Sequence, residues 1–386
     1  MLVQARGETV NKETFFSQVW PAEETCEGNL AQHIFMLRNI LQKYDSRHPY
    51  ILTVSGHGYR LGADVRDGHA FTMFSDADSE LLRLCLIGNH LLEKRSSATI
   101  GLAQQHFEDA LRINEEYAPA LIGLARARAL VAEYMYALPA AGFEDAKEIL
   151  TRTLALHPNS GNAHALLSEI ALFADWDVAA AENALSAALE LDSESPLARA
   201  NVVWFNLCKG DIDEALRQCH RAMQRSPSSL ALLYLLGRVL VHRGDYKAAQ
   251  KCFADVLETD TDFVLAKEWL GLALLFDGDP AACISEVRNL NTNEDRDLSY
   301  LMARASAEAG HAGDARAVLS SMRLRQSDEY IPSWYLACVE TALGMTSEAT
   351  EHLKSAAQSR EVPVLFVRSL PMFDAPTVAS ANLQPL

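Results

Sequence analysis

The chain has 386 residues, of which 49% are hydrophobic and 22% charged, the composition of a globular protein with more than one folded unit. Its formal net charge of −17 argues against nucleic-acid binding over the surface as a whole. The charge is uneven, because residues 1–66 hold seven Lys or Arg and seven Asp or Glu, and the whole acidic excess lies downstream.

The first two predicted elements are helices. Residues 11–20 begin at Asn11, a good N-cap residue, and are followed by Pro21, which is expected to end the helix. Residues 29–41 have one apolar face, which predicts a second helix that packs on a core. The side chains of that face are Leu30, Ile34, Leu37 and Leu41.

A β-hairpin is predicted after the second helix. Residues 50–62 alternate around Gly56 and Gly58 and are rich in β-forming residues, which indicates two strands and a turn. The polar face of the preceding helix carries Asn and Gln, side chains that can bond adenine in the major groove. Two helices followed by a hairpin are the order of a winged helix-turn-helix.

A larger set of residues makes this interpretation specific: Gly7, Val10, Val19, Trp20, Asn29, Gln32, His33, Ile34, Leu37, Arg38, Thr53, Val54, Gly56, Gly58, Tyr59 and Arg60. Together they resemble the OmpR/PhoB-type DNA-binding domain of bacterial regulators. In that family the second helix of the motif enters the major groove, and the wing reaches the backbone or minor groove. The resemblance implies base-edge contacts from Asn29, Gln32, His33 and Met36. It implies phosphate or sugar contacts from Arg38, Thr53, His57, Tyr59 and Arg60. Such contacts position the protein on the duplex but do not distinguish one base sequence from another.

Three of these side chains also have a structural interpretation. His33 is as well suited to packing in the protein as to contacting a base. Tyr59 is also typical of a core residue, and Arg60 is also typical of a solvated surface charge. Family members often carry Arg in the middle of the second helix, where this chain has Phe35 and Met36. That departure argues against strong guanine recognition.

The resemblance further implies a small sheet and a full first helix ahead of residue 1, so this unit is expected to be a partial winged helix. Uncovering each large apolar side chain that would pack on the missing piece costs about 1.5–3 kcal/mol. The net stability of a small domain is only about 5–15 kcal/mol. Three possibilities remain open for the exposed apolar face of this unit. The missing piece is encoded upstream, helices of the array cover the face, or the unit is decaying and its DNA binding is weak or lost.

A repeat follows the polar stretch 64–80, which is predicted to be a linker between a unit at 1–63 and an array at 81–360. A small residue recurs after a first gap of 43 and then gaps of 32 to 35, and a larger apolar residue follows four positions later except at Cys219. The residue seven positions later lies on the same helical face. Glycines five positions before most of these residues suit the ends of preceding helices. The small residues are Ala103, Ala146, Ala181, Ala215, Ala249, Cys283, Ala315 and Ala349.

This period resembles the tetratricopeptide repeat, whose best copy here has Gly237, Gly244, Tyr246, Ala249 and Phe253 in the family's positions. The resemblance predicts a mainly α fold in which about eight helical hairpins stack into a solenoid, each burying its face on its neighbours. The long first gap predicts an insertion or a lengthened helix pair around 125–143. Residues 361–386 are predicted to be a closing segment and tail, and residues 375–386, which have no periodicity, are expected to be frayed.

Catalytic, metal and cofactor sites are not indicated. The sequence has no nucleotide-binding loop, serine-hydrolase motif or zinc-protease motif, and its seven scattered cysteines form no C-x-x-C pair. Adjacent acidic residues such as Glu108 and Asp109 are interpreted as solvated faces. No apolar run reaches the roughly 18 residues of a membrane span, and no secretory signal is apparent. We therefore expect a cytoplasmic protein that is not an enzyme.

The layout predicts a transcription regulator that binds double-stranded promoter DNA through residues 29–60 and a protein partner, or itself, through the array. It resembles the invasion-gene activators of enteric pathogens, the HilA type. The alternative is an adaptor or scaffold whose partial N-terminal domain no longer binds DNA, and whose acidic concave surface holds a basic peptide or helix.

Overall fold

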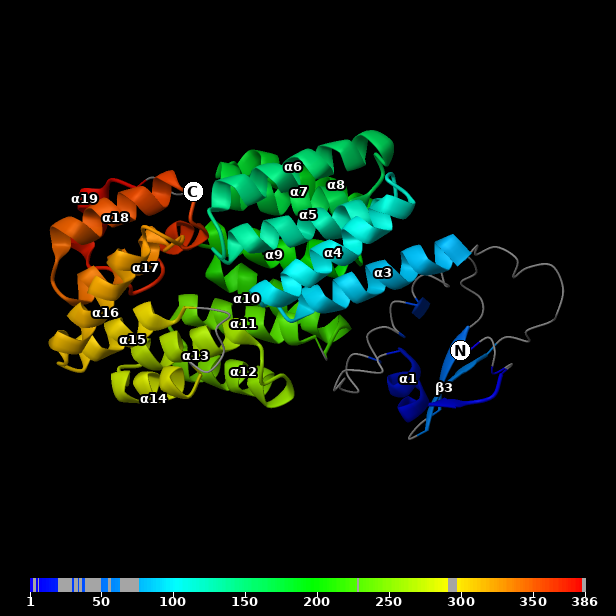
Figure 1. Ribbon diagram of the computed structural model, residues 1–386, viewed down its shortest axis with the longest axis horizontal. Helices are drawn as coiled ribbons and strands as arrows, with labels where there is room; N and C mark the ends of the chain where they lie inside the picture. Colours follow the sequence, from blue (N-terminus) through cyan, green and yellow to red (C-terminus); the bar gives the residue numbers. More distant parts are fainter. Residues whose placement is uncertain are drawn as a thin grey trace. The chain divides into compact units, whose positions relative to one another are not determined.

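The computed structural model divides into two compact units, Met1–Ser75 and Asp76–Leu386, which are described separately (Figure 1). It describes the chain apart from residues 3–4, 6, 20–29, 31–33, 35–36, 39–49, 55–56, 63–75, 228, 291–296 and 384–386.

The first unit contains the predicted first helix and hairpin. Helix α1 (Lys12–Val19) is capped as expected, because the Asn11 carboxamide oxygen accepts a hydrogen bond of 2.7 Å from the Thr14 amide. Strands β2 (Ile51–Val54) and β3 (Gly58–Leu61) pair antiparallel. A short strand that the sequence did not predict, β1 (Val10–Asn11), pairs with the other edge of β3, so the sheet order is β1-β3-β2.

A small apolar core holds this unit together. Leu30 and Ile34, two members of the predicted aliphatic face, are 2% and 1% exposed, and Leu37 packs beside them. Leu41, the fourth member, lies outside the described residues. The predicted packing face of the second helix is therefore confirmed at the three described positions.

The second unit is an array of helical pairs. Within its described residues, each pair is a hairpin of two helices joined by a short connection, and the expected eight hairpins are present (Figure 1). In order they are α3 (Asp76–Glu93) and α4 (Ser97–Ile113), α5 (Ala118–Glu133) and α6 (Pro139–Leu156), α7 (Gly161–Ile170) and α8 (Val178–Leu191), α9 (Pro196–Cys208) and α10 (Ile212–Arg225), α11 (Leu230–Arg243) and α12 (Tyr246–Thr259), α13 (Val264–Phe276) and α14 (Pro280–Leu290), α15 (Ser299–Glu308) and α16 (Ala312–Arg325), and α17 (Ser333–Ala342) and α18 (Thr346–Gln358).

The residues that the sequence repeat predicted to pack between helices are the ones that are buried in the structure. All eight small residues of the series are at most 1% exposed, as are six of the eight side chains four positions later. The turn glycines have φ between 73° and 88°, the left-handed conformation that ends the first helix of a hairpin. The long first gap is a lengthened pair, since α5 and α6 have 16 and 18 residues.

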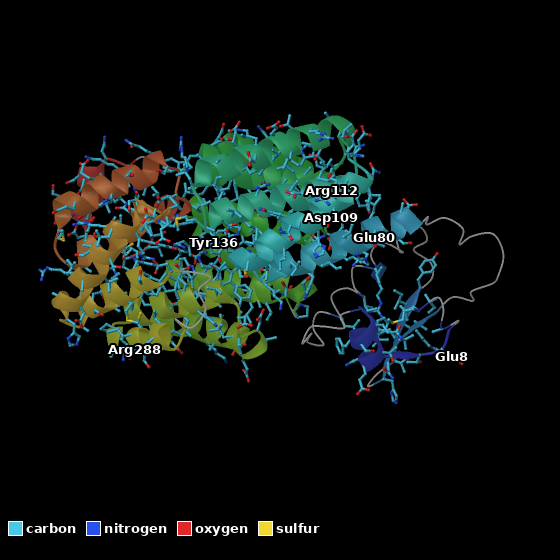
Figure 2. The ribbon with its side chains drawn as sticks, viewed as in Figure 1. Glu8, Glu80, Asp109, Arg112, Tyr136 and Arg288 are labelled. Atoms are coloured by element: carbon cyan, nitrogen blue, oxygen red, sulfur yellow. The ribbon has the colours of Figure 1, made fainter. Side chains whose placement is uncertain are left out.

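Charged residues on the second helices face solvent, as expected. Asp109 and Arg112 form an ion pair along α4 and are 41% and 72% exposed (Figure 2). Glu108 is 43% exposed. An exposed pair one helical turn apart contributes only about 0.2–0.5 kcal/mol, so these acids are solvated surface and not a site.

The C-terminal residues correct one prediction. The expectation of a frayed tail after residue 374 was wrong, because residues Ala375–Ala381 form helix α19. Asp374 caps it by accepting a 2.8 Å hydrogen bond from the Thr377 amide, and Thr377 and Ala381 are buried. A helix of seven residues is too short to show a reliable apolar period, which is why the sequence did not reveal it.

Residues 361–373, which we call the strap, return across the array (Figure 1). They include the 3-10 helix η2 (Val362–Phe366). The Phe366 ring is 2% exposed and lies 4.8 Å from the ring of His242 on α11 and 6.1 Å from that of Trp204 on α9. Arg304 on α15 donates to the Met372 carbonyl at 2.5 Å. The strap thus joins the last hairpin to the middle of the array.

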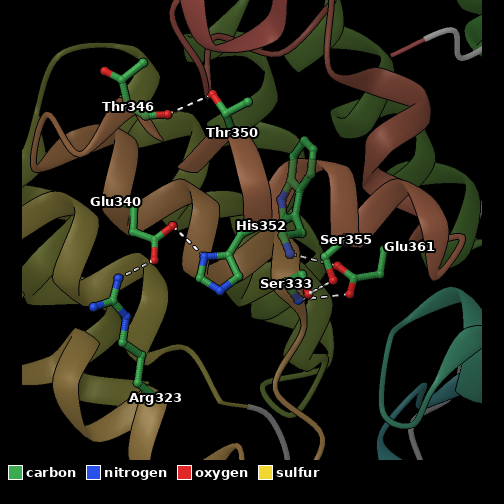
Figure 3. A network of polar contacts seen from close by, with 9 residues as sticks. Arg323, Ser333, Glu340, Thr346, Thr350, His352, Ser355 and Glu361 are labelled. Atoms are coloured by element: carbon green, nitrogen blue, oxygen red, sulfur yellow. Dashed lines mark hydrogen bonds and ion pairs between the residues drawn. The ribbon is translucent and has the colours of Figure 1, made fainter. Parts of the chain in front are cut away.

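Buried carboxylates hold the start of the strap and the last hairpins in place (Figure 3). Glu361 is fully buried and accepts hydrogen bonds from the Ser333 and Trp334 amides at 2.9 and 2.8 Å, so it satisfies the N-terminus of α17 that no local side chain caps. Burial raises the pKa of Glu361, although these amides oppose the shift. Glu340, also fully buried, joins Arg323 on α16 to His352 on α18, each at 2.7 Å.

Candidate nucleic-acid interface

The β2–β3 hairpin presents different residues on its two faces. Ile51 pairs with Leu61 and Thr53 with Tyr59, and this face turns toward the core because Ile51 and Tyr59 are buried. Arg60 pairs with Leu52 on the opposite face, where its side chain is exposed. His57, next to the turn, is exposed as well. Thr53 is exposed too, although it lies on the same face as the buried Ile51. Arg60, His57 and Thr53 are thus the candidate residues of the hairpin that the structure places at the surface.

Arg38 is tied to the wing. Its Nε donates to the Ile51 carbonyl at 2.9 Å, and its Nη2 donates to the Thr53 hydroxyl at 2.7 Å. The guanidinium carbon lies 6.0 Å from the centre of the Tyr59 ring. One side chain thus connects the second predicted helix to both strands of the hairpin. No periodicity or spacing signal in the sequence indicated this contact.

Tyr59 lies in the core, as its structural interpretation allowed. The side chain is 7% exposed, and its ring meets the Phe15 ring edge-on at 6.0 Å. Its neighbour Gly58 has φ of 151°, and a Cβ placed there would stand 2.1 Å from the Val10 carbonyl oxygen of β1. The second glycine of the predicted turn is therefore required by strand contact, a reason that the sequence pattern did not show.

The four proposed base-reading residues, Asn29, Gln32, His33 and Met36, lie outside the described residues. The described neighbours of this set are Leu30, Ile34 and Leu37, which pack in the core as predicted.

The described residues contain no group of three or more His, Cys, Asp or Glu side chains placed to hold a metal ion. The six cysteines among these described residues are buried with free thiols, and burial raises the pKa of the Cys85 and Cys219 thiols to about 12. Thiols of this kind are poor nucleophiles at neutral pH. Within the described part of the chain, no helix is both long and apolar enough to cross a membrane.

Comparison with protein families agrees with both predicted units. Residues 1–61 match the family described as transcriptional regulatory protein, C terminal. Residues 207–271 match the tetratricopeptide repeat family. The OmpR/PhoB-type and tetratricopeptide resemblances inferred from the residues are thereby confirmed.

Two curated relatives align with the N-terminal unit. The transcriptional regulator HilA of Salmonella typhimurium is 43% identical over 65 residues, which are 17% of this chain and 12% of that protein. The protein of the same name from Salmonella typhi is 42% identical over an alignment of the same coverage. The matched stretch is therefore about one eighth of the relatives' length.

A solved structure resembles the array. The human IFIT1 dimer with m7Gppp-AAAA aligns with a TM-score of 0.51 and 16% identity, covering 85% of this chain and 77% of that chain. At this identity the likeness shows a shared helical-repeat fold and nothing about ligands.

Proposed function

We propose that this chain is a cytoplasmic transcription regulator that binds promoter DNA through residues 29–60 and uses its array for protein–protein contact or self-association. The observation that carries the proposal is a winged-helix family match at residues 1–61 joined to a tetratricopeptide array in one chain. The aligned Salmonella proteins are described as transcriptional regulators. No catalytic role is proposed.

Within the DNA-binding unit, the described geometry separates residues proposed to contact DNA from residues proposed to hold the wing in place. Arg60 and His57, exposed on the hairpin, are proposed to contact phosphate or sugar, as wings do. Arg38, hydrogen-bonded to both Ile51 and Thr53, is proposed to hold the wing at its angle to the helix. Tyr59 supports the wing from the core. Asn29, Gln32, His33 and Met36 remain the proposed base-reading set.

Replacing Arg60 with alanine is expected to weaken binding to all duplexes alike, because a phosphate contact carries no sequence information. The slope of log K against log salt should fall in magnitude by about 0.9, the value for one phosphate contact. Fluorescence anisotropy with a duplex selected from a random pool, and with an unselected duplex, measures both effects.

The matched comparison is Gln32→Ala, which should instead relax preference at one base pair by about 1–3 kcal/mol. If the unmodified chain binds neither duplex at low salt, the adaptor function replaces this proposal.

Replacing Arg38 with lysine separates positioning from phosphate contact. Lysine keeps the charge but has no planar fork to reach the Ile51 carbonyl and the Thr53 hydroxyl together. We expect affinity for the selected duplex to fall about tenfold while the salt slope stays unchanged. The same anisotropy series tests this. Full retention of affinity in Arg38→Lys would contradict the positioning role and indicate that Arg38 contacts a DNA phosphate.

A further inference from the structure

The second helices of the first three hairpins each end on an exposed aliphatic side chain. These residues are Ile113 on α4, Leu156 on α6 and Leu191 on α8, and they are 45%, 39% and 43% exposed. Each stands ten positions after the small residue that marks its hairpin, so the three side chains occupy the same place in successive repeats. Single exposed apolar residues are ordinary on a protein surface, but a row of them is typical of a contact site.

The repeat itself does not require an apolar residue at this place. The second helices of hairpins four, five and seven end on Arg225, Thr259 and Arg325 at the same position. These hairpins bury their small residues as completely as the first three do. Stacking within the array therefore does not explain the aliphatic side chains of the first three hairpins.

The three aliphatic ends belong to one continuous surface, because the connections that follow the second helices touch one another. His157 Nε2 donates to the Glu116 carbonyl oxygen at 3.0 Å, which joins the first connection to the second. A Cβ placed at Gly161, at the start of α7, would stand 3.5 Å from the Leu191 Cβ, which joins the second to the third. We call this surface the ledge, and it consists of residues 113–117, 156–160 and 190–195.

The ledge is acidic. Its three stretches contain five Asp or Glu and no Lys or Arg, and the acidic residues are Glu115, Glu116, Glu190, Asp192 and Glu194. Glu194 is already paired, with Arg199 at 2.7 Å and with Arg225. Arg152, beside the ledge, donates to the Glu115 carbonyl oxygen at 3.1 Å. The other carboxylates outnumber this guanidinium, so the surface around the aliphatic side chains is negative.

We propose that the ledge binds a basic amphipathic helix of a partner protein. The apolar face of that helix lies on Ile113, Leu156 and Leu191, and its Lys or Arg side chains pair with the surrounding carboxylates. A second copy of the chain is a poorer occupant, because joining two ledges would place carboxylates opposite carboxylates. The inference rests on the proposed role of the array in protein–protein contact, and it names the surface and the chemistry of the partner.

The test uses the full chain and a fluorescein-labelled synthetic peptide of about 18 residues, with leucines on one face of a helix and lysines on the other. Anisotropy should rise saturably as the chain is added, and binding should weaken with salt, which screens exposed charges. A peptide of the same composition with its leucines spread around the helix should bind about tenfold more weakly. Hydrogen exchange should slow at the amides of the ledge when the amphipathic peptide is present.

Leu156→Arg introduces the residue that hairpins four and seven already carry at this place, so the repeat accommodates it. Binding of the amphipathic peptide should weaken about tenfold or more, because an apolar contact is lost and the new charge repels lysine. Thr259→Arg makes the same change of charge at the same position of hairpin five and is the matched control. It should bind as the unmodified chain does.

Glu190→Lys tests the charge of the ledge without altering its apolar side chains. Because an exposed ion pair contributes little, we expect binding to weaken about threefold at low salt and less at high salt. Glu258→Lys reverses an exposed charge at the corresponding position of hairpin five and should have no effect.

Four outcomes would overturn the proposal. The two peptides bind equally well, or Leu156→Arg and Thr259→Arg weaken binding alike, or exchange slows on another surface of the array. The last is a dimer of the unmodified chain, detected by light scattering, that Leu156→Arg converts to a monomer. That result would make the ledge an interface between copies of the chain.

Duplex binding, measured in parallel, distinguishes failure of the ledge from failure of the DNA-binding role. Absence of peptide binding with duplex binding retained rejects the ledge alone. Absence of duplex binding with peptide binding at the ledge rejects the DNA-binding role and leaves the ledge supported.

Discussion

Replacing Phe366 with alanine is expected to destabilise the array by about 3–5 kcal/mol, the cost of deleting a fully buried aromatic ring. The ring is 2% exposed and packs against His242 and Trp204, more than 120 residues away in the chain. Guanidinium unfolding followed by circular dichroism at the helical band measures the loss, provided that the unfolding slope is unchanged.

Phe373→Ala is the matched control within the strap. Its ring is only partly buried and meets Trp334 edge-on at 4.8 Å, so we expect a smaller cost of about 1–2 kcal/mol. Equal losses in the two variants, or a loss below 1 kcal/mol for Phe366→Ala, would show that the strap is not part of the core of the array.

The strap changes how the array is expected to use its surface. A concave face open to a basic peptide or helix was one expectation from the repeat pattern. In the structure, Val362, Phe366, Leu370 and Met372 of the same chain lie on that side and line a small cavity with the first helices of the hairpins. We therefore propose that a protein partner docks on another surface of the array. Contacts between the strap and hairpins four and five also couple repeats that otherwise touch only their neighbours.

Replacing Gly58 with alanine is expected to have the largest effect on the N-terminal unit. The position has φ of 151°, and the added Cβ would stand 2.1 Å from the Val10 carbonyl oxygen, so either β1 or β3 must move. Backbone strain alone costs about 1–3 kcal/mol, and separation of the strands adds to it. We expect a loss of several kcal/mol, comparable with the stability of a small domain, and hence loss of DNA binding.

Gly7→Ala separates the cost of backbone strain at a positive φ from the cost of the steric clash between the added Cβ and a neighbouring strand. Gly7 also has a positive φ, of 90°, but a Cβ placed there meets nothing within 4 Å. It should therefore show the conformational cost without the clash. Thermal unfolding monitored by hydrogen exchange of the β3 amides, together with duplex binding, compares the variants. Similar losses for Gly7→Ala and Gly58→Ala would refute the role of strand contact.

Much of the fold follows from local patterns in the sequence. The small residue that recurs along the array, from Ala103 to Ala349, marks the helix contacts because each hairpin packs mainly on its neighbours in the chain. The cap at Asn11 and the hairpin at 50–62 are also local, since the groups that form them lie a few residues apart. The candidate DNA-contacting residues were inferred from the order of these local elements together with the resemblance to the OmpR/PhoB-type domain.

By itself, then, the sequence determined the two units, the register of the repeats and the packing face of the second helix. Only the tertiary structure decided that Arg38 bonds the wing, that Gly58 must accommodate β1, and that the strap covers one side of the array around Arg238. These features join residues that are distant in the chain. No spacing rule within one element specifies such contacts, because they depend on how completed elements pack together.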